Sequence, residues 1–132
     1  AQIERLGLAA DVRMVGFRDD LLDVFRSLDL FVIPTIEGDT IPQVLMQALA
    51  LGLPVVSTTT GSIPDVVADG ESGFIVPPRD ADALADRIGR LLADPDLRAA
   101  MGRRGRKTVE RSYSIDRMVD ELEGVYRRVI TP

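Results

Sequence analysis

The chain has 132 residues, and 45% of them are hydrophobic, which is enough to form the core of one globular domain. Its 16 basic and 21 acidic residues give a net charge of −5, which argues against a module that binds nucleic acid through a basic surface. Because the chain has no cysteine and no histidine, disulfides, thiol nucleophiles and every catalytic site that needs an imidazole are excluded. No apolar run is long enough to cross a membrane, and the first residues do not predict a signal peptide.

The charges are unevenly distributed along the chain. Residues 1–78 carry 4 basic and 11 acidic side chains, whereas residues 79–132 carry 12 basic and 10 acidic ones. The basic excess lies mainly in Arg103, Arg104, Arg106 and Lys107. Such a cluster on a helix is usually a solvated surface, although it can also contact an anionic surface or a partner domain.

Four short apolar runs in the first part of the chain predict buried parallel strands. They cover residues 12–15, 30–33, 53–56 and 74–76, and each is bounded by glycine or proline. Segments with helical spacing lie between them, at residues 21–28, 44–51 and 63–67. The alternation of strands and helices predicts an α/β fold, with a Rossmann-like parallel sheet flanked by helices and joined by right-handed crossovers.

The last third of the chain has a different pattern. Residues 79–132 predict an all-helical tail, whereas residues 1–78 form the α/β portion. The final helix is expected over residues 115–130, with Ser114 as its N-cap. Its apolar stripe must pack on the sheet or on another surface, because it contains large side chains at helical spacing.

One loop and the helix after it are the best candidate for a ligand site. A strand ends at Pro34, a polar loop follows, and a helix is expected to begin with Pro42 in its first turn. Ligands of open α/β sheets bind beyond the carboxyl ends of the strands, where a helix N-terminus suits a phosphate. Asp39 would lie just before this helix, and Gln47 one to two turns inside it. From residue types alone, Asp39 or Thr40 could equally be a simple helix cap, and Gln47 a surface residue.

Several motifs together resemble a known family. They are residues 11–17 (DVRMVGF), 28–35 (LDLFVIPT), 52–58 (GLPVVST), 61–67 (GSIPDVV) and 69–78 (DGESGFIVPP). In this order they resemble the C-terminal half of the group 1 (family-4) retaining glycosyltransferases, which have the GT-B fold. The resemblance covers nearly the whole chain, including the helical tail.

This resemblance implies a site for a nucleotide-sugar donor. In the family, two glutamates separated by seven residues contact the donor sugar and the ribose hydroxyls. The matching positions here are Asp39, which would be the catalytic residue, and Gln47, which would bind the ribose. Glu37 lies nearby at the wrong spacing. Asp39 keeps the negative charge with a shorter side chain, whereas Gln47 loses the charge but still donates and accepts hydrogen bonds.

Other donor-binding positions follow from the same resemblance. The loop from Gly38 through Thr40 to Ile41, with Val44 in the helix, would present its backbone to the donor sugar and phosphate. Phe17 and Arg18 would border the nucleotide base; alternatively, this is an ordinary loop in which Phe17 packs. The hydroxyl-rich residues 57–60 could bind ligand, or only solvate the loop and cap the next helix.

The resemblance also implies parts that this chain does not contain. These are the N-terminal half, which binds an acceptor sugar, lipid or small molecule, the first two strands of the C-terminal half, and a basic pair that holds the diphosphate. The chain would thus be a partial domain, inactive by itself, of an enzyme that transfers a sugar to an acceptor hydroxyl with retention. It would need no cofactor or metal. The resemblance also implies a cytoplasmic location, and the full-length enzyme could contact a membrane peripherally.

Two other functions were weighed against this one. A non-catalytic interaction domain, or a degenerate nucleotide-sugar-binding domain, is favoured by the departures at Asp39 and Gln47 and by the missing basic pair. A dehydrogenase-like or epimerase-like nucleotide binder is not supported, because no G-x-G-x-x-G motif follows a strand.

The sheet edge gives a further prediction. In the strand order 3-2-1-4-5-6, the missing first two strands would lie between residues 12–15 and residues 30–33. Either these two segments pair directly, or another polypeptide covers the open edge, so that the isolated chain self-associates.

Overall fold

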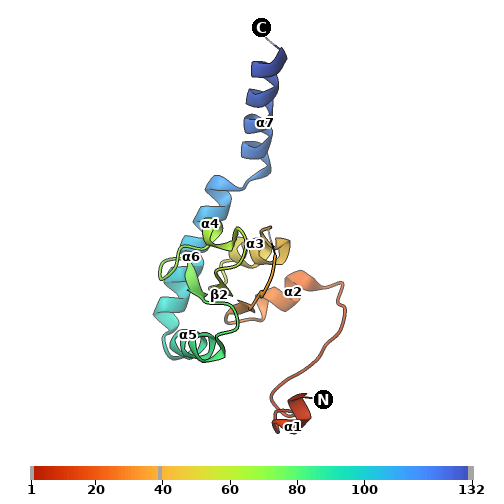
Figure 1. Ribbon diagram of the computed structural model, residues 1–132, viewed down its shortest axis with the longest axis vertical. Coiled ribbons are helices and arrows are strands. Elements are labelled where there is room, and N and C mark those ends of the chain that lie inside the picture. The colour runs from red at the N-terminus through yellow and green to blue at the C-terminus, as the bar shows by residue number, and fades with distance from the viewer. Residues whose placement is uncertain (1, 39, 131–132) are drawn as a thin grey trace.

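The computed structural model describes residues 2–38 and 40–130, and its centre is a small parallel sheet (Figure 1). The sheet has three strands in the order β1-β2-β3: β1 (Phe31–Ile33), β2 (Val55–Thr58) and β3 (Gly73–Val76). In the parallel register, Phe31 lies opposite Val55, and Val55 lies opposite Gly73. The described helices are α1 (Gln2–Arg5), α2 (Leu21–Arg26), α3 (Gln43–Ala50), α4 (Ile63–Val66), α5 (Ala81–Ala93), α6 (Pro95–Ser112) and α7 (Ile115–Ile130).

Helices cover both faces of the sheet and enclose two apolar clusters. On one face, side chains of α2, α3 and α4 pack against β2, with Phe25, Leu45 and Ile63 as buried members. On the other face, Leu91 of α5 and Met101 of α6 are buried together with Phe74 of β3. Because both faces are covered, β2 is buried at every position, including the polar residues Ser57 and Thr58 at its end. The predicted α/β architecture is therefore confirmed.

Local signals in the sequence fix where the long helices begin. Asp80 Oδ1 accepts a hydrogen bond from the Ala83 N–H at 2.9 Å, and Asp94 Oδ1 accepts one from the Leu97 N–H at 2.9 Å. These are N-cap bonds, and each supplies an acceptor to an amide that has none within its own helix. Ser114 Oγ accepts a longer bond of 3.3 Å from the Arg117 N–H, so the predicted capping of α7 by Ser114 is confirmed.

A close backbone contact joins α6 to the end of α3. Gly52 has φ +77°, a left-handed conformation that suits the residue after a helix. A Cβ atom added to Gly102 would lie 1.9 Å from the carbonyl oxygen of Gly52. The contact is possible only because residue 102 has no side chain.

The start of α3 differs from the prediction in one detail. Pro42 is the N-cap residue with an extended ψ of 128°, so the helix begins at Gln43 and not with Pro42 in its first turn. Among the residues that the structure describes, no side chain caps this helix through a hydrogen bond, so the interpretation of Thr40 as its cap is wrong. The same interpretation of Asp39 lies outside the described residues.

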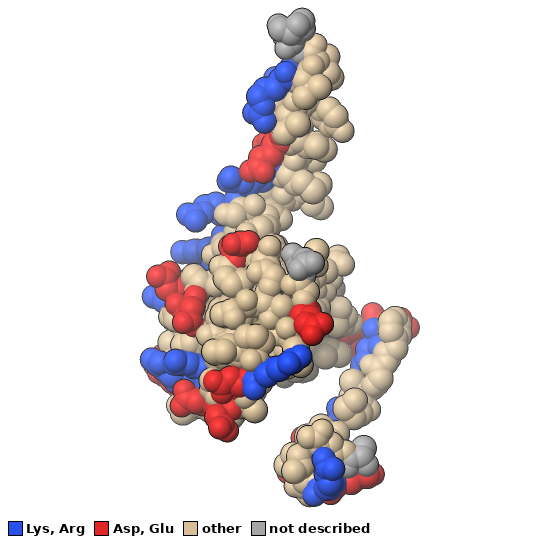
Figure 2. Space-filling view, in the orientation of Figure 1, with Lys and Arg blue, Asp and Glu red and all other residues tan. Residues whose placement is uncertain are grey.

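The sheet-containing part of the chain, residues 21–112, is called the body below. Residues 2–20 and α7 extend away from it in Figure 1. The stripe on α7 is exposed, with 61% of Met118, 49% of Leu122 and 78% of Val129 accessible. Basic side chains follow one side of α6 and α7 in Figure 2, whereas the other side of α7 is largely uncharged.

The strand predicted at residues 12–15 is wrong. These residues have no regular secondary structure, and all of them are exposed. Within the described residues β1 pairs with β2 alone, so the predicted pairing of residues 12–15 with residues 30–33 is also wrong. The physical reason is that a strand needs a neighbour. In the order 3-2-1-4-5-6, the strand that precedes β1 in the chain is not its neighbour in the sheet. Coverage of the β1 edge by another polypeptide stays a prediction.

Among the helices of residues 2–38 and 40–130, none combines the length and the apolar character that crossing a membrane requires.

Candidate functional site

The three strands end at one edge of the sheet, after Ile33, Thr58 and Val76, and the loops that follow them form the candidate site. Hydroxyl groups tie two of these loops together. Ser57 Oγ donates to the Ile33 carbonyl at 2.9 Å, and the Thr58 and Thr60 hydroxyls donate to the Thr35 carbonyl at 2.5 and 2.9 Å. Three hydroxyls of residues 57–60 therefore hold the loop after β1, which is neither of the two roles that the sequence suggested for them.

The loop between β1 and α3 spans residues 34–42 and leads into the N-terminus of α3 at this edge. Gly38 and Thr40 are exposed, as donor-binding groups would be. Ile41 and Val44 are half-buried, and their side chains pack against the core beneath α3. Asp39, the candidate catalytic residue, lies outside the described residues, and its predicted position beside Gln47 stays a prediction.

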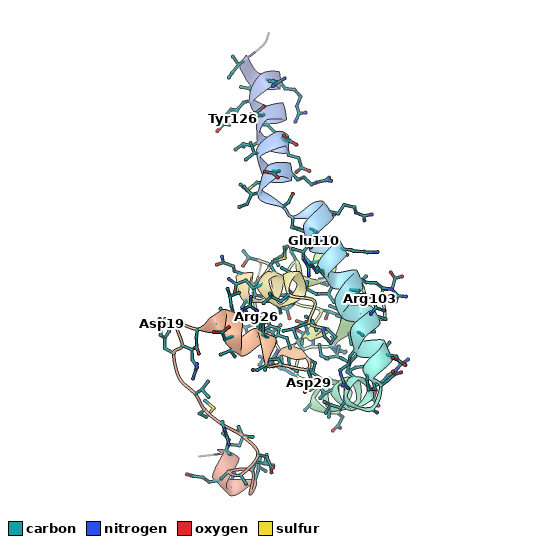
Figure 3. The ribbon with its side chains drawn as sticks, turned by 180° about the vertical axis from the view of Figure 1, so that it is seen from behind. Asp19, Arg26, Asp29, Arg103, Glu110 and Tyr126 are labelled. Atoms are coloured by element: carbon teal, nitrogen blue, oxygen red, sulfur yellow. The ribbon has the colours of Figure 1, made fainter. Side chains whose placement is uncertain are left out.

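Gln47 is half-buried and borders a hollow of about 610 Å³ between α2 and α3. The other lining residues are Asp19, Asp20, Leu21, Leu22, Asp23, Phe25 and Arg26. Figure 3 shows the labelled Asp19 where the N-terminal segment meets α2, and Arg26 on α2 itself. The lining thus contains three carboxylates and one guanidinium; Asp23 is paired with Arg26, and Asp20 is paired with Arg18 outside the lining.

The role of Phe17 and Arg18 as a border for the nucleotide base stays a prediction, whereas the alternative of an ordinary loop with a packed Phe17 can be checked. Phe17 is 93% exposed, so the alternative in which it is a packing residue is wrong. The Arg18 guanidinium is engaged by Asp20: Nε donates to Oδ1 at 2.6 Å, and Nη2 donates to Oδ2. This hydrogen bonding holds the pKa of Asp20 below its usual value and raises the pKa of Arg18. The structure therefore brings the carboxylate partner of Arg18, not Arg18 itself, to the hollow that Gln47 lines.

An ion pair at the same edge was missed from the sequence. Arg79, in the loop after β3, has its Nη2 atom 3.6 Å from Oε1 of Glu37, in the loop after β1. Arg79 has φ +65°, the left-handed conformation that glycine adopts far more readily than arginine. The place of Arg79 in the sequence could have indicated a residue at this edge. Arg79 directly follows the double proline that ends a buried strand, and ligands bind beyond such strand ends.

A cluster of three or more acidic side chains suited to holding a metal ion is absent from the residues that the structure describes.

The description "Glycosyl transferases group 1" belongs to the protein family whose profile matches residues 1–108. The chain belongs to this family. Its resemblance to the C-terminal half of the GT-B glycosyltransferases, inferred above from five motifs, is therefore confirmed.

Similar proteins agree with this assignment. The capsular polysaccharide biosynthesis glycosyltransferase CapM of Staphylococcus aureus is 34% identical over 116 residues, which is 88% of this chain and 30% of CapM. The sucrose-phosphate synthase of Thermosynechococcus elongatus superposes with a TM-score of 0.89 at 29% identity, over 98% of this chain and 33% of the synthase. HepE of Anabaena, solved in complex with UDP, has a TM-score of 0.87 at 25% identity, over 95% of this chain and 35% of HepE.

This chain therefore spans about a third of the length of these relatives. HepE has also been solved with UDP-glucose, and that structure matches this chain with a TM-score of 0.85. The solved relatives thus show a nucleotide and a nucleotide sugar bound to a protein that contains this fold.

Proposed function

We propose that this domain binds the nucleotide-sugar donor of a retaining glycosyltransferase. The observation that carries the proposal is the arrangement of α3 at the carboxyl edge of the sheet. The N-terminus of this helix and Gln47, which lines the hollow, both belong to it. The fold match to HepE, solved with UDP-glucose, supports this class of donor. The first N–H groups of α3 have no acceptor within the helix and would face the phosphates.

Each residue has a defined task in this proposal. The amide of Gln47 bonds the ribose hydroxyls by donating and accepting, and the Asp39 carboxylate contacts the donor sugar. The backbone of Gly38, Thr40 and Ile41 holds the sugar and the phosphates in place. The basic pair that the family resemblance implies would hold the diphosphate.

The reaction is the transfer of a sugar to an acceptor hydroxyl. The bond between the anomeric carbon and the phosphate oxygen breaks, and the acceptor oxygen bonds to that carbon on the same face. The proton of the acceptor hydroxyl goes to the departing phosphate oxygen, so no imidazole base is required. This route suits a chain with no histidine.

The first test measures the binding of UDP-glucose to the intact protein by calorimetry. Gln47→Ala should weaken binding roughly tenfold, because it removes hydrogen bonds to the ribose. Gln47→Glu should tighten binding, because a carboxylate accepts hydroxyl hydrogen bonds more strongly. Gln43→Ala is the matched control, since Gln43 lies on the same helix and does not line the hollow. Equal affinities for all these variants would remove Gln47 from the donor site.

The second test separates catalysis from folding. Asp39→Asn should lower turnover by roughly a hundredfold or more while changing the melting temperature little, because a loop carboxylate contributes little to the core. Retained turnover with a large fall in melting temperature would assign Asp39 a structural role. If neither the parent protein nor the Asp39→Asn variant binds UDP-glucose, the result would support the non-catalytic alternative instead.

A further inference from the structure

The end of β2 buries hydroxyl groups in the middle of the sheet. Ser57 and Thr58 are 0% and 2% exposed, and they follow the apolar residues Val55 and Val56 in the same strand. A buried hydroxyl gives up its bonds to water and needs a partner within the protein. Valine has nearly the shape of threonine and also favours strands, so packing alone does not explain Thr58. The explanation must lie in what its hydroxyl bonds.

The hydroxyls of Thr58 and Thr60 both point at one carbonyl oxygen in the loop after β1. Thr58 Oγ1 donates to the Thr35 carbonyl at 2.5 Å, and Thr60 Oγ1 donates to it at 2.9 Å. The two hydroxyl oxygens lie 3.1 Å apart. A carbonyl oxygen has two lone pairs and each hydroxyl has one proton, so the two bonds occupy both acceptor positions of this carbonyl. They therefore fix its direction as well as its position.

Thr35 lies beside the part of the loop that is proposed to hold the donor. Its N–H donates to the Ile33 carbonyl at 3.0 Å, so the chain turns as soon as β1 ends. A Cβ atom added to Gly38 would lie 3.7 Å from Cγ2 of Thr35, which is ordinary van der Waals contact. Gly38 has φ +154°, a conformation that residues with a side chain rarely adopt. A displacement of Thr35 would therefore reach Gly38 through a direct contact.

Two simpler roles for these hydroxyls explain less. Thr58 is buried and its one proton is given to the Thr35 carbonyl, so its side chain is not available to a ligand. Thr60 is half-buried, and its proton goes to the same carbonyl. Stability is a weak reason for the bonds, because both partners of a neutral hydrogen bond give up bonds to water on folding. Two donors on one carbonyl instead provide a fixed geometry.

We propose that Thr58 and Thr60 are positioning residues for the donor site. They act through the Thr35 carbonyl and hold the loop of residues 34–42 in one conformation, in which its backbone groups meet the donor sugar and the phosphates. The inference rests on the proposed function, which assigns those backbone groups to the donor. Groups that bind a ligand need such support, because a site held loosely by its surroundings binds and reacts poorly.

The experiment compares two ligands on the intact protein. Thr58→Val keeps the shape of the side chain and removes its proton, and should weaken the binding of UDP-glucose about tenfold in calorimetry. Uridine has neither the glucose nor the phosphates, so its affinity in an NMR titration should stay unchanged. Thr58→Ser restores the hydroxyl and should restore the binding of UDP-glucose. The double variant Thr58→Val/Thr60→Val removes both donors and should bind UDP-glucose more weakly than Thr58→Val.

Ser72→Ala is the matched control, because it also removes a buried hydroxyl that bonds the backbone. Ser72 is 2% exposed, and its Oγ accepts the Ala68 N–H at 2.9 Å. It directly precedes β3 and so lies at the opposite edge of the sheet from the candidate site. This variant should lose about as much thermal stability as Thr58→Val but keep the affinity of the parent for UDP-glucose. The amide resonance of Gly38 should shift in Thr58→Val and not in Ser72→Ala.

Three outcomes would overturn the inference. They are unchanged binding of UDP-glucose in Thr58→Val, equal weakening in Ser72→Ala, and equal weakening of uridine and UDP-glucose in Thr58→Val. The last two would show that the hydroxyl only stabilises the fold. Failure of the proposed function is a different result, because it appears as absent binding of UDP-glucose to the parent protein.

Discussion

Leu91 in α5 and Leu122 in α7 each lie on the apolar stripe of an amphipathic helix, but Leu91 is fully buried and Leu122 is 49% exposed. The same contrast holds between the body and the segments outside it. In the body, α5 and α6 close over one face of the sheet, whereas α7 extends away from it (Figure 1). Periodicity therefore determines that a segment is helical and which face is apolar. Burial is decided by whether another surface covers that face.

The largest effect is expected from truncating the two leucines. Leu91→Ala should lower the free energy of unfolding by about 2–5 kcal/mol, because it leaves a cavity in a closed cluster. Leu122→Ala is the matched change on α7 and should lower it by less than about 0.5 kcal/mol. Urea denaturation followed by circular dichroism measures both values. A similar loss of unfolding free energy in the two variants would show that the apolar stripe of α7 is covered in solution. Burial would then no longer distinguish α5 from α7.

A second comparison uses glycines inside helices. Gly102→Ala should destabilise the body by about 3 kcal/mol, because the new methyl group meets the backbone of Gly52. Gly89 in α5 has open space around it, so alanine there should stabilise the body by roughly 0.5–1 kcal/mol, whereas Gly124→Ala, also in open space, should raise the helicity of α7 and leave the unfolding of the body unchanged. Thermal unfolding of the three variants provides the measurement. A Gly102→Ala variant as stable as the parent would mean that α6 and the end of α3 lie further apart than described.

The same contrast explains which parts of the fold were predictable from the sequence. Residues 53–56 and 74–76 predicted strands correctly to within two residues, because they are apolar on both faces and their partners lie in this chain. Residues 12–15 are also mostly apolar, but they contain Arg13 and have no strand beside them among the described residues. Composition reports the tendency to form a strand, whereas pairing depends on a neighbour that a local pattern cannot supply.

The candidate site was predictable in position but not in detail. The strand end at Pro34 and the helix start near Pro42 correctly located the carboxyl edge of the sheet. The bond between Arg18 and Asp20 and the pair between Arg79 and Glu37 were not predictable. Side-chain partners of this kind depend on rotamers and on how loops meet, and neither leaves a periodic signal in the sequence.

A smaller effect is expected at the helix caps. Asp94→Ala should cost about 1 kcal/mol of the unfolding free energy of the body, because it removes the 2.9 Å bond to the Leu97 N–H at the start of α6. Ser114→Ala removes the cap of α7 and should reduce helicity at residues 115–118 while leaving the unfolding of the body unchanged. Urea denaturation measures the first effect, and backbone carbon chemical shifts measure the second. Comparable losses of body stability would contradict the independence of α7.

The smallest effect concerns pH. The hydrogen bond from Arg18 holds the pKa of Asp20 below its ordinary value. Its contribution to stability is therefore present above the pKa of the unfolded chain, and is lost as the pH falls through the lower pKa of the folded state. Because both groups are exposed, only a slight change in stability is expected. Arg18→Gln should raise the pKa of Asp20, as followed by the carboxyl carbon shift, whereas Arg13→Gln should not.

The contact between Gly52 and Gly102 also constrains the order in which this chain can fold. It joins positions separated by about 50 residues. Closing the loop between them therefore costs conformational entropy before the contact can stabilise the fold. Met101, beside it, is fully buried in the same cluster as β2 and β3. On the ribosome, the strands are therefore synthesised well before the helix that closes over them. Until α6 emerges, the nascent sheet exposes one apolar face, and it is during this interval that the chain is most open to aggregation or to capture by a chaperone.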